Sequence, residues 1–313
     1  MSFRIIDPGP MTLIQDAGRH GYQHLGVTTG GPMDEQAFDW GNWLLGNPRG
    51  VAALEITFGM LVMEAESEMT LALTGADLGA RLNNTPLPSW QTFVARPGDR
   101  LSFSRPVRGL RAYLAMSGGI RASARLGSVA TVPREQLGGL NGDGQPLQRG
   151  DRLQPLWDQP RERRNLPERA IPDYSEPLRL GLIPGYQYDH FSVAQRMNFL
   201  TSRYTLTPNM DRMGYRLSGP AVSHEQSGII SEGIALGAVQ VPQDGQPIIL
   251  MRDRQTIGGY PKMGCVFSLD LARLSQKLPG DQVEFTLLDA AEAENRRMLY
   301  DRQFATDGDP DHY

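Results

Sequence analysis

A weak internal repeat is the feature that most limits what this chain can fold into. The tetrapeptide Arg-His-Gly-Tyr at residues 19–22 recurs as Arg-Met-Gly-Tyr at residues 212–215. A Pro-Gly-Asp turn followed by alternating apolar residues occurs at residues 97–104 and again at residues 279–286. The matches come in the same order, and a turn that leads into an alternating segment is typical of a β-strand. The repeat therefore predicts a duplicated, β-rich domain.

The composition supports many turns and few long helices. Of 313 residues, 35 are glycine and 23 are proline, spread along the chain. Such an excess favours a β-rich fold over a helical bundle. At about 150 residues per domain, the length suits two domains. Prolines and charges crowd residues 157–177, the best linker candidate, so we expect one domain over residues 1–170 and another, with a C-terminal helix, over residues 171–313.

Local patterns place the individual elements. Apolar residues on either side of a polar turn predict strands at residues 61–65 and 69–73. The turn sequence Pro-Gln-Asp-Gly-Gln-Pro predicts a hairpin between strands at residues 238–241 and 248–251. Apolar periodicity and capping residues predict three helices, at residues 34–45, 189–201 and 289–304.

Charge and motifs exclude several classes of protein. Thirty-one basic and 35 acidic residues give a net charge of −4 without a sustained basic run, which argues against nucleic-acid binding. The sequence has no P-loop, no zinc-binding pattern and no Met-Lys-Met biotin-attachment signature. It has no apolar stretch of 18 residues, no apparent signal peptide and one cysteine, Cys265. We therefore expect a soluble, cytoplasmic protein without a metal site.

Two segments combine glycines with side chains suited to a small ligand. Glycines let the backbone approach a ligand closely, and Asp, Arg, Gln and Lys beside them can orient a carboxylate, amide or phosphate. The alternative is that the glycines only form turns and the charges pair with one another. The candidates are Asp16, Arg19 and Tyr22 in the first segment and Gln246, Asp253, Gln255, Gly258, Gly259, Tyr260 and Lys262 in the second.

The order of these motifs resembles a known family. The most specific strings are Asp-Arg-Met-Gly-Tyr-Arg-Leu at residues 211–217 and Gln-Thr-Ile-Gly-Gly-Tyr-Pro at residues 255–261. Gln-Asp-x-Gly-Arg at residues 15–19 and Leu-Gly-Gly at residues 137–139 also match. Over nearly the whole chain, the sequence is similar to the family named for allophanate hydrolase subunit 2, or KipA, and most similar to its members that are C subunits of 5-oxoprolinase.

The resemblance implies a fold and a set of partners. Family members resemble the carboxyltransferase half of urea carboxylase and consist of two cyclophilin-like β-barrels, so we expect a mostly β protein with a few short helices. The resemblance implies a complex with a KipI-like B subunit and a LamB/YcsF-like A subunit, which together use ATP to open 5-oxo-L-proline to L-glutamate. The sequence does not locate an ATP site in this chain, and we expect no covalently attached biotin.

The resemblance also suggests roles for the candidate residues. Asp16 or Asp253 is the expected general base. Arg19, Tyr22 and their repeat-related counterparts Arg212 and Tyr215 are expected to line one wall of the pocket. Gln246, Gln255, Gly258, Gly259, Tyr260 and Lys262 are expected to line the other, with a cationic side chain holding the substrate carboxylate or a phosphoryl oxygen. The alternative is that the arginines form ion pairs and the tyrosines belong to the core.

Two other functions are compatible with the same motifs. One is a carboxyltransferase-type subunit of a urea or amide carboxylase or an allophanate hydrolase system, which takes a carboxyl group from carboxybiotin on a separate protein. The other is a regulatory protein that binds and antagonises a KipI-type inhibitor. The absent attachment motif argues against a self-contained biotin enzyme, but not against one with a separate carrier.

Overall fold

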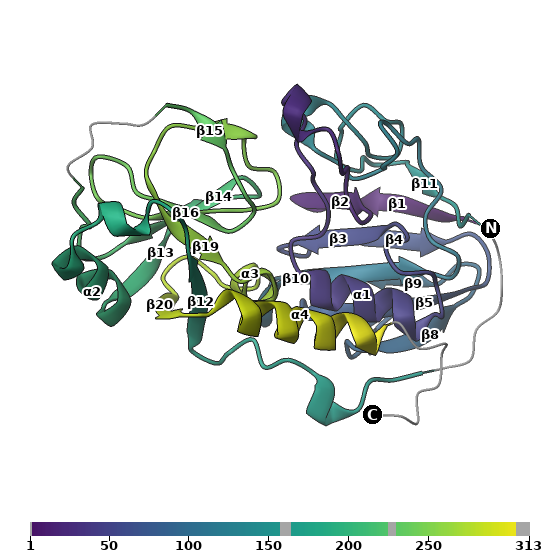
Figure 1. The fold of residues 1–313 in the computed structure, drawn as a ribbon. Coiled ribbons are helices and arrows are strands. Elements are labelled where there is room, and N and C mark those ends of the chain that lie inside the picture. The colour runs from purple at the N-terminus through teal and green to yellow at the C-terminus, as the bar shows by residue number, and fades with distance from the viewer. Residues whose placement is uncertain (1, 157–163, 225–229, 305–313) are drawn as a thin grey trace. The chain divides into compact units, whose positions relative to one another are not determined.

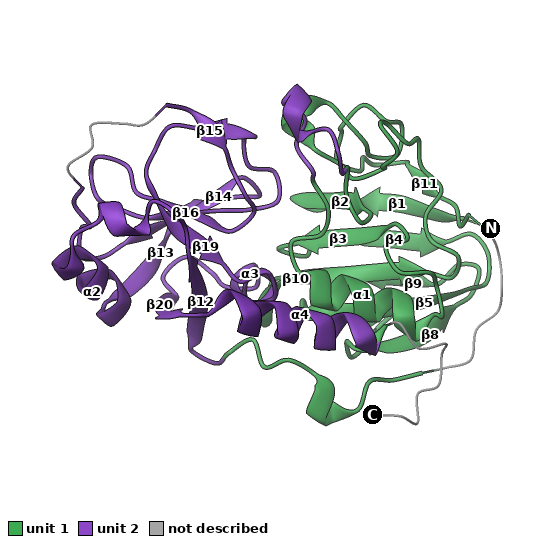
Figure 2. Cartoon of the chain, in the orientation of Figure 1, with its two compact units in different colours: residues 1–19, 30–175, 304–313 green, residues 20–29, 176–303 purple. Residues whose placement is uncertain are grey.

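The computed structural model describes residues 2–156, 164–224 and 230–304 (Figure 1). Within these residues the chain forms two compact units (Figure 2). Unit 1 comprises residues up to 19, residues 30–175 and Phe304, and unit 2 comprises residues 20–29 and 176–303. The boundary expected near residue 170 concerns folding domains and stays a prediction. Part of the expected linker, residues 157–163, lies outside the described residues.

Unit 1 contains two β-sheets. The six-stranded sheet has the order β11 (Arg152–Leu153), β1 (Phe3–Asp7), β4 (Val62–Ala65), β9 (Arg100–Ser102), β6 (Arg81–Leu82) and β7 (Thr85–Pro86). The five-stranded sheet has the order β2 (Met11–Gln15), β3 (Ala53–Thr57), β10 (Arg108–Met116), β5 (Met69–Asp77) and β8 (Gln91–Ala95). All the recorded strand pairs in both sheets are antiparallel, as expected for strands joined by short turns.

Apolar side chains from both sheets form one buried core. Phe3, Ile14, Leu54, Leu71 and Leu101 all belong to it and are at most 1% exposed. Burial of each such side chain stabilises the fold by about 1.5–3 kcal/mol relative to exposure. This shared core holds the two sheets of unit 1 together.

Helix α1 (Glu35–Leu44) packs on β5 and β10. It begins after Asp34, whose side chain accepts a hydrogen bond from the backbone N–H of Ala37 at 3.0 Å. An acceptor at this position satisfies one of the N–H groups that a helix start leaves without a partner. Phe38 and Tyr113 belong to a second buried cluster, which α1 shares with the five-stranded sheet.

Unit 2 is a closed barrel of seven strands. Their order is β12 (Leu178–Pro184), β19 (Lys262–Val266), β16 (Ala238–Gln240), β17 (Ile248–Leu250), β14 (Gly214–Ser218), β13 (Arg203–Met210) and β20 (Gln282–Leu287). β20 runs parallel to β12 and antiparallel to β13, which closes the ring. A separate short ladder pairs β15 (Glu232–Gly233) with β18 (Ile257–Gly258). Closure removes the exposed strand edges that an open sheet would present.

The remaining elements are helices. Unit 2 contains the helices α2 (Val193–Thr201), α3 (Ser268–Leu274) and α4 (Ala290–Gln303). Single turns of 3₁₀-helix occur at η1 (Gln23–Leu25), η2 (Pro133–Glu135), η3 (Glu168–Ala170) and η4 (Tyr188–His190).

The mostly β fold expected from the sequence is confirmed. The barrel is closed in unit 2, whereas the strands of unit 1 form two sheets around one core. The predicted hairpin is present as β16 and β17, and the two repeated Pro-Gly-Asp turns lead into β9 and β20.

The helix predictions need two corrections. The second predicted helix begins at Val193 rather than at residue 189, because Ser192 caps it and accepts a hydrogen bond from the N–H of Gln195 at 3.3 Å. Residues 188–190 form the separate turn η4 instead. Helix α3 is an addition, since its seven residues are too few to give a clear periodic signal.

Two glycines with similar backbone angles test how tightly β5 packs. Gly75 has φ +81° and Gly98 has φ +87°, so alanine at either position costs about 1–2 kcal/mol in backbone strain. A Cβ at Gly75 would also lie 2.5 Å from the carbonyl oxygen of Arg111, whereas a Cβ at Gly98 would meet nothing within 4 Å.

We expect Gly75→Ala to lower the free energy of unfolding clearly more than Gly98→Ala does, by roughly 3 kcal/mol or more against about 1–2 kcal/mol. Urea unfolding followed by circular dichroism measures both. Equal losses for the two variants would show that β5 and β10 are not packed as described.

Candidate active site

A cavity of about 260 Å³ lies in unit 2 between two parts of the barrel and the separate β15–β18 ladder. The turn after β12 contributes residues 185–187, the short strand β15 contributes Glu232 and Gly233, and β19 contributes Lys262, Gly264 and Cys265. Ala235 and Ala238 complete the lining. Small residues thus form much of the wall, and a few polar side chains converge on one space, as in typical small-molecule sites.

Gln187 organises the polar side of this cavity. The residue is 3% exposed. Its Nε2 donates to Oε1 of Glu232 at 2.9 Å and to the hydroxyl of Tyr186 at 2.8 Å. Its Oε1 accepts a hydrogen bond from the backbone N–H of Lys262 at 2.8 Å. One buried amide therefore fixes the positions of residues from three separate segments.

Lys262 and Glu232 form an ion pair at the cavity. Nζ of Lys262 lies 2.5 Å from Oε1 of Glu232, and the lysine side chain is 11% exposed. The hydroxyl of Tyr186 donates to the other carboxylate oxygen of Glu232. Burial opposes ionisation of Glu232, but the hydrogen bonds from Lys262 and Tyr186 outweigh it, so the pKa of this carboxyl lies below its ordinary value. Glu232 is therefore a carboxylate at neutral pH.

The cavity also contains the single thiol of the chain. Cys265 is partly buried, and this burial raises its pKa, although the positive charges of Arg254 and Lys262 oppose the shift. The group is consequently a neutral thiol at pH 7 and not an activated nucleophile. Burial, with repulsion from Arg252 in addition, lowers the pKa of Arg254 to about 10, so this residue remains a cation at neutral pH.

Gly258 packs against two side chains that a Cβ would displace. A Cβ there would lie 2.5 Å from Cδ1 of Ile234 and 2.8 Å from Nε2 of Gln240. Gln240 is 2% exposed, and its Nε2 makes no hydrogen bond with any of the residues that the structure describes. Gly258 is the strand partner of Glu232. Nε2 of Gln240 therefore lies close to the β15–β18 ladder, which carries the Glu232 carboxylate.

Asp16 and Arg19, the candidates in the first half of the chain that lie in unit 1, form hydrogen bonds with loop residues. Oδ1 of Asp16 accepts hydrogen bonds from Gly18 N–H at 2.9 Å and the Ser128 hydroxyl at 2.6 Å, and Oδ2 accepts one from Val129 N–H at 2.7 Å. The buried guanidinium of Arg19 donates to the carbonyl of Ala130 at 2.8 Å. These contacts tie distant loops of unit 1 together.

Tyr22 belongs to unit 2 and is partly buried. It does not line the cavity that contains Lys262.

Asp253, the second candidate for the general base, forms a buried ion pair with Arg212, which was predicted to line the pocket. Nε and Nη2 of Arg212 donate to the two carboxylate oxygens of Asp253, each at 2.8 Å. Both side chains are 6% exposed. A bidentate pair of this kind has strong geometric specificity, and removing one partner leaves an uncompensated buried charge. The arrangement matches the alternative sequence interpretation, in which charges of these motifs pair with one another.

The other predicted residues have varied environments. Tyr215 is fully buried on β14. The amide of Gln246 accepts from the N–H of Gly219 at 2.9 Å and donates to its carbonyl at 3.1 Å. Gln255 and Tyr260 are exposed, and Gly259 is partly exposed. Of the residues predicted in the second segment and its repeat partner, Lys262 is the one that lines the cavity, and Gly258 pairs with its Glu232.

Sequence reasoning missed Tyr186, Gln187 and Glu232. Each stands in a short string that contains a glycine, Gly-Tyr-Gln at residues 185–187 and Glu-Gly at residues 232–233. The same rule that singled out residues 246–262, polar side chains beside glycines, also applies to these shorter strings. The signal was available but is weak at this length.

Comparison with known proteins identifies the family. Residues 25–287 match the family described as carboxyltransferase domain, subdomain A and B. The chain belongs to this family. It is 36% identical over 302 residues to the 5-oxoprolinase C subunit of Escherichia coli, with 96% of each chain covered.

Urea-metabolising proteins contain a similar region within longer chains. Over 296 residues, the chain is 31% identical to a putative urea carboxylase of Emericella nidulans, covering 90% of this chain and 24% of that protein. The crystal structure of Kluyveromyces lactis urea carboxylase superposes with a TM-score of 0.91 at 28% identity, over 97% of this chain and 29% of that one. The carboxyltransferase family therefore includes both free-standing subunits and parts of larger enzymes.

None of the helices in the described residues is both long and apolar enough to cross a lipid bilayer. Within the same residues, no three His, Cys, Asp or Glu side chains are grouped so as to hold a metal ion.

The ion pair in the cavity predicts how Glu232 titrates. In Lys262→Met, the carboxylate loses a hydrogen bond and a positive charge, so we expect the pKa of Glu232 to rise. Because the wild-type pKa is depressed, the stability from this pair is present at neutral pH and is lost as the pH falls through that pKa. Lys262→Met should therefore be less stable than wild type at pH 7, and the difference should shrink in acid.

Carboxyl ¹³C shifts of Glu232, followed by NMR as a function of pH, measure this pKa. The matched control is Lys277→Met, which removes the other lysine of the chain, bound to the carbonyl of Glu176 at 2.7 Å. We expect the control to leave the Glu232 titration unchanged. An unchanged titration in Lys262→Met would refute the ion pair.

Proposed function

We propose that this chain is the C subunit of an ATP-dependent 5-oxoprolinase complex that hydrolyses 5-oxo-L-proline to L-glutamate. The observation that carries the proposal is the 36% identity to the 5-oxoprolinase C subunit of Escherichia coli over 96% of both chains. A second relative of that name, from Haemophilus influenzae, is 35% identical over 95% of each chain. Agreement along the full length of both proteins favours this activity over that of a longer, multidomain enzyme.

The cavity in unit 2 has the chemistry that this substrate needs. A 5-oxoproline molecule presents one carboxylate and one lactam group. Nζ of Lys262 has three N–H donors, so it can bind the substrate carboxylate while it keeps its contact with Glu232. The Glu232 carboxylate can accept a hydrogen bond from the lactam N–H. Gln187 holds both residues in place. A volume of about 260 Å³ suits a small ring compound.

In the proposed reaction, this chain binds and orients the lactam while the complex activates it. An unactivated lactam is a poor electrophile, so activation by phosphoryl transfer from ATP makes attack by water on the ring carbonyl feasible. We propose that a KipI-like B subunit shares the activation and that a LamB/YcsF-like A subunit completes the hydrolysis. ATP is used by the complex, and we assign its binding site to no residue of this chain.

The predicted acids Asp16 and Asp253 do not line the cavity that contains Lys262. Their oxygens are bound to loop N–H groups and to Arg212, respectively. Within the cavity, Glu232 is the carboxylate that is ionised at neutral pH. We therefore propose Glu232, rather than either aspartate, as the acid of this chain that contacts the substrate.

A covalently attached biotin does not fit this site. A biotinylated lysine has to be exposed, because an attached biotin swings between two active sites. Lys262, in contrast, is 11% exposed, and its Nζ is engaged by Glu232. The sequence around it, Pro-Lys-Met, also differs from the attachment signature. We propose that any biotin chemistry of this chain would depend on a separate carrier protein.

The family match and the likeness to urea carboxylase favour one second candidate function. In this alternative, the chain is a carboxyltransferase subunit that transfers a carboxyl group from carboxybiotin on a separate carrier to urea or another amide. Both functions require recognition of a small amide, so the polar side chains of the cavity do not distinguish one function from the other. The two reactions are distinguished by their products.

The test is glutamate formation from 5-oxo-L-proline and ATP by this chain with its proposed A and B subunits. We expect glutamate formation to stop when this chain is omitted. We expect Lys262→Met to lower kcat/KM by roughly 10- to 100-fold, because it removes a charged hydrogen bond to the substrate worth about 1.5–3 kcal/mol. Lys277→Met, outside the cavity, should retain activity.

A complex that assembles but forms no glutamate would contradict the oxoprolinase proposal. The same preparation, supplied with a biotin carboxylase, its carrier and urea, then tests the second candidate by urea-dependent ATP hydrolysis.

A further inference from the structure

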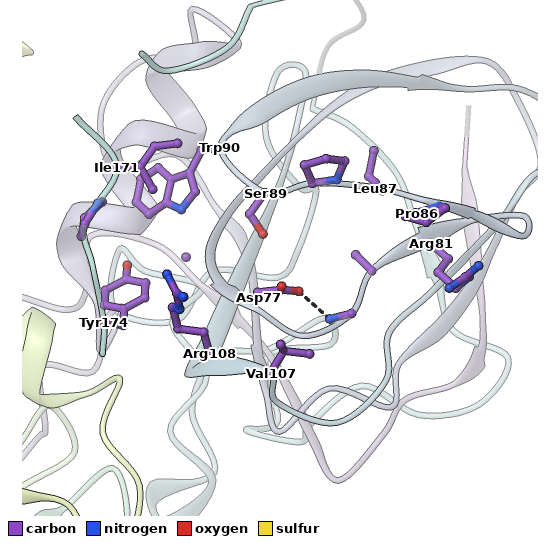
Figure 3. Close-up of a pocket in the computed structure, with 15 residues that line it drawn as sticks. Asp77, Arg81, Pro86, Leu87, Ser89, Trp90, Val107, Arg108, Ile171 and Tyr174 are labelled. Carbon is purple, nitrogen blue, oxygen red and sulfur yellow. Dashed lines mark hydrogen bonds between the residues drawn. The ribbon is translucent and has the colours of Figure 1, made fainter. Parts of the chain in front are cut away.

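A second cavity, of about 480 Å³, lies in unit 1 and is separate from the proposed active site (Figure 3). Its walls come from the end of β5, the segment at residues 79–81, the loop at residues 86–90, the start of β10 and the segment at residues 171–174. None of the sequence motifs described above accounts for it. The side chains that matter are Asp77, Trp90, Arg108, Ile171 and Tyr174.

Three charged residues line this cavity: Asp77, Arg81 and Arg108. Nη2 of Arg81 donates to the carbonyl of Asn84 at 2.7 Å, whereas Asp77 and Arg108 carry opposite charges that do not pair with each other. Arg108 and Asp77 are direct partners in the antiparallel pair of β10 and β5. Side chains directly opposite in such a pair are close neighbours, and opposite charges there normally attract each other. Here, Oδ1 of Asp77 accepts a hydrogen bond from the N–H of Gly79 at 2.8 Å instead. Nη1 of Arg108 lies 3.7 Å from Oδ1 of Asp173, and the arginine side chain is 61% exposed.

Figure 3 shows the same separation, with Arg108 directed toward Tyr174 and Asp77 turned toward the other end of the pocket. The strand register shifts between Arg108 and Ala112, and this irregularity accompanies the separation. Among the described residues, the guanidinium therefore has one long ion pair and the carboxylate one backbone donor. Both groups retain hydrogen-bonding capacity for a ligand.

An apolar wall stands beside these charges. Trp90, Ile171 and Tyr174 belong to one hydrophobic cluster, and the two aromatic residues are 4% and 7% exposed. The hydroxyl of Tyr174 donates to Asp34 at 2.8 Å, which fixes the ring. Trp90 has φ +68°, a conformation that a non-glycine residue adopts only when its surroundings impose it. Strained residues of this kind cluster at ligand sites.

We propose that this cavity binds a free α-amino acid with an apolar side chain. Arg108 binds the α-carboxylate, Asp77 binds the α-ammonium group, and the wall of Trp90, Ile171 and Tyr174 contacts the side chain. The Asp77 carboxylate repels a phosphate group placed beside it, and the Arg108 guanidinium repels a simple cation placed beside it. A zwitterion satisfies both charges at once. The proposal does not depend on the proposed function.

Isothermal titration calorimetry of the full chain tests the proposal with three probes of similar shape. L-phenylalanine has both charges, 3-phenylpropionate lacks the ammonium group, and 2-phenylethylamine lacks the carboxylate. We expect L-phenylalanine to bind at least 10-fold more tightly than either analogue. L-glutamate, the product of the proposed reaction, should bind more weakly than L-phenylalanine because its charged side chain does not suit the apolar wall.

Variants assign the binding to this cavity. We expect Asp77→Asn and Arg108→Gln each to weaken L-phenylalanine binding about 10- to 100-fold. Asn at position 77 retains an oxygen for the Gly79 N–H, so the loop should keep its structure. Arg105→Gln, a neighbouring exposed arginine outside the cavity, should bind as wild type does.

Equal affinity for the three probes, no binding of L-phenylalanine at millimolar concentration, or unchanged binding in both charge variants would overturn the proposal. These measurements need neither ATP nor partner proteins, so their failure is distinguishable from failure of the oxoprolinase proposal.

Discussion

The antiparallel pairing of β12 with β19 in the barrel of unit 2 is the constraint on which the proposed active site depends. β20 pairs with β12 on one side and with β13 on the other, and it completes a ring in which β12 also pairs with β19. The pairing of β12 with β19 sets Pro184 opposite Gly264. Gln187, just beyond the end of β12, therefore reaches the backbone of Lys262 at the start of β19.

The partly buried charges of Glu232 and Lys262 require several hydrogen-bonding partners. This requirement explains why Tyr186 and Gln187 lie beside them. Removing an ion pair from water carries a desolvation penalty that Coulomb attraction offsets only when other hydrogen bonds satisfy the remaining groups. Tyr186 and Gln187 supply those bonds to the Glu232 carboxylate. The group is thus held in place before any substrate binds, and preorganised polar groups of this kind are what binding and catalysis require.

The sequence predicted what depends on neighbouring residues and missed what depends on the pairing of strands that are distant in sequence. Turn chemistry and alternation were enough for the β16–β17 hairpin, and the signal for a helix at residues 34–45 was local. For the site, Lys262 was predicted from its glycine-rich surroundings. Gln187 lies 75 residues from Lys262 and 45 from Glu232 in sequence, so only the folded barrel brings them together. Arg212 and Asp253 show the converse, because motif charges that suggested catalysis form a buried ion pair.

The most direct measurement is titration of the full chain with 5-oxo-L-proline, followed by NMR signals of the Gln187 side-chain amide and the Lys262 backbone amide. These two groups share the hydrogen bond that joins the turn after β12 to β19. We predict saturable shifts of both signals in wild type and their absence in Lys262→Met. Saturable binding with shifts confined to residues outside this cavity, or identical binding by Lys262→Met, would contradict the proposed active site.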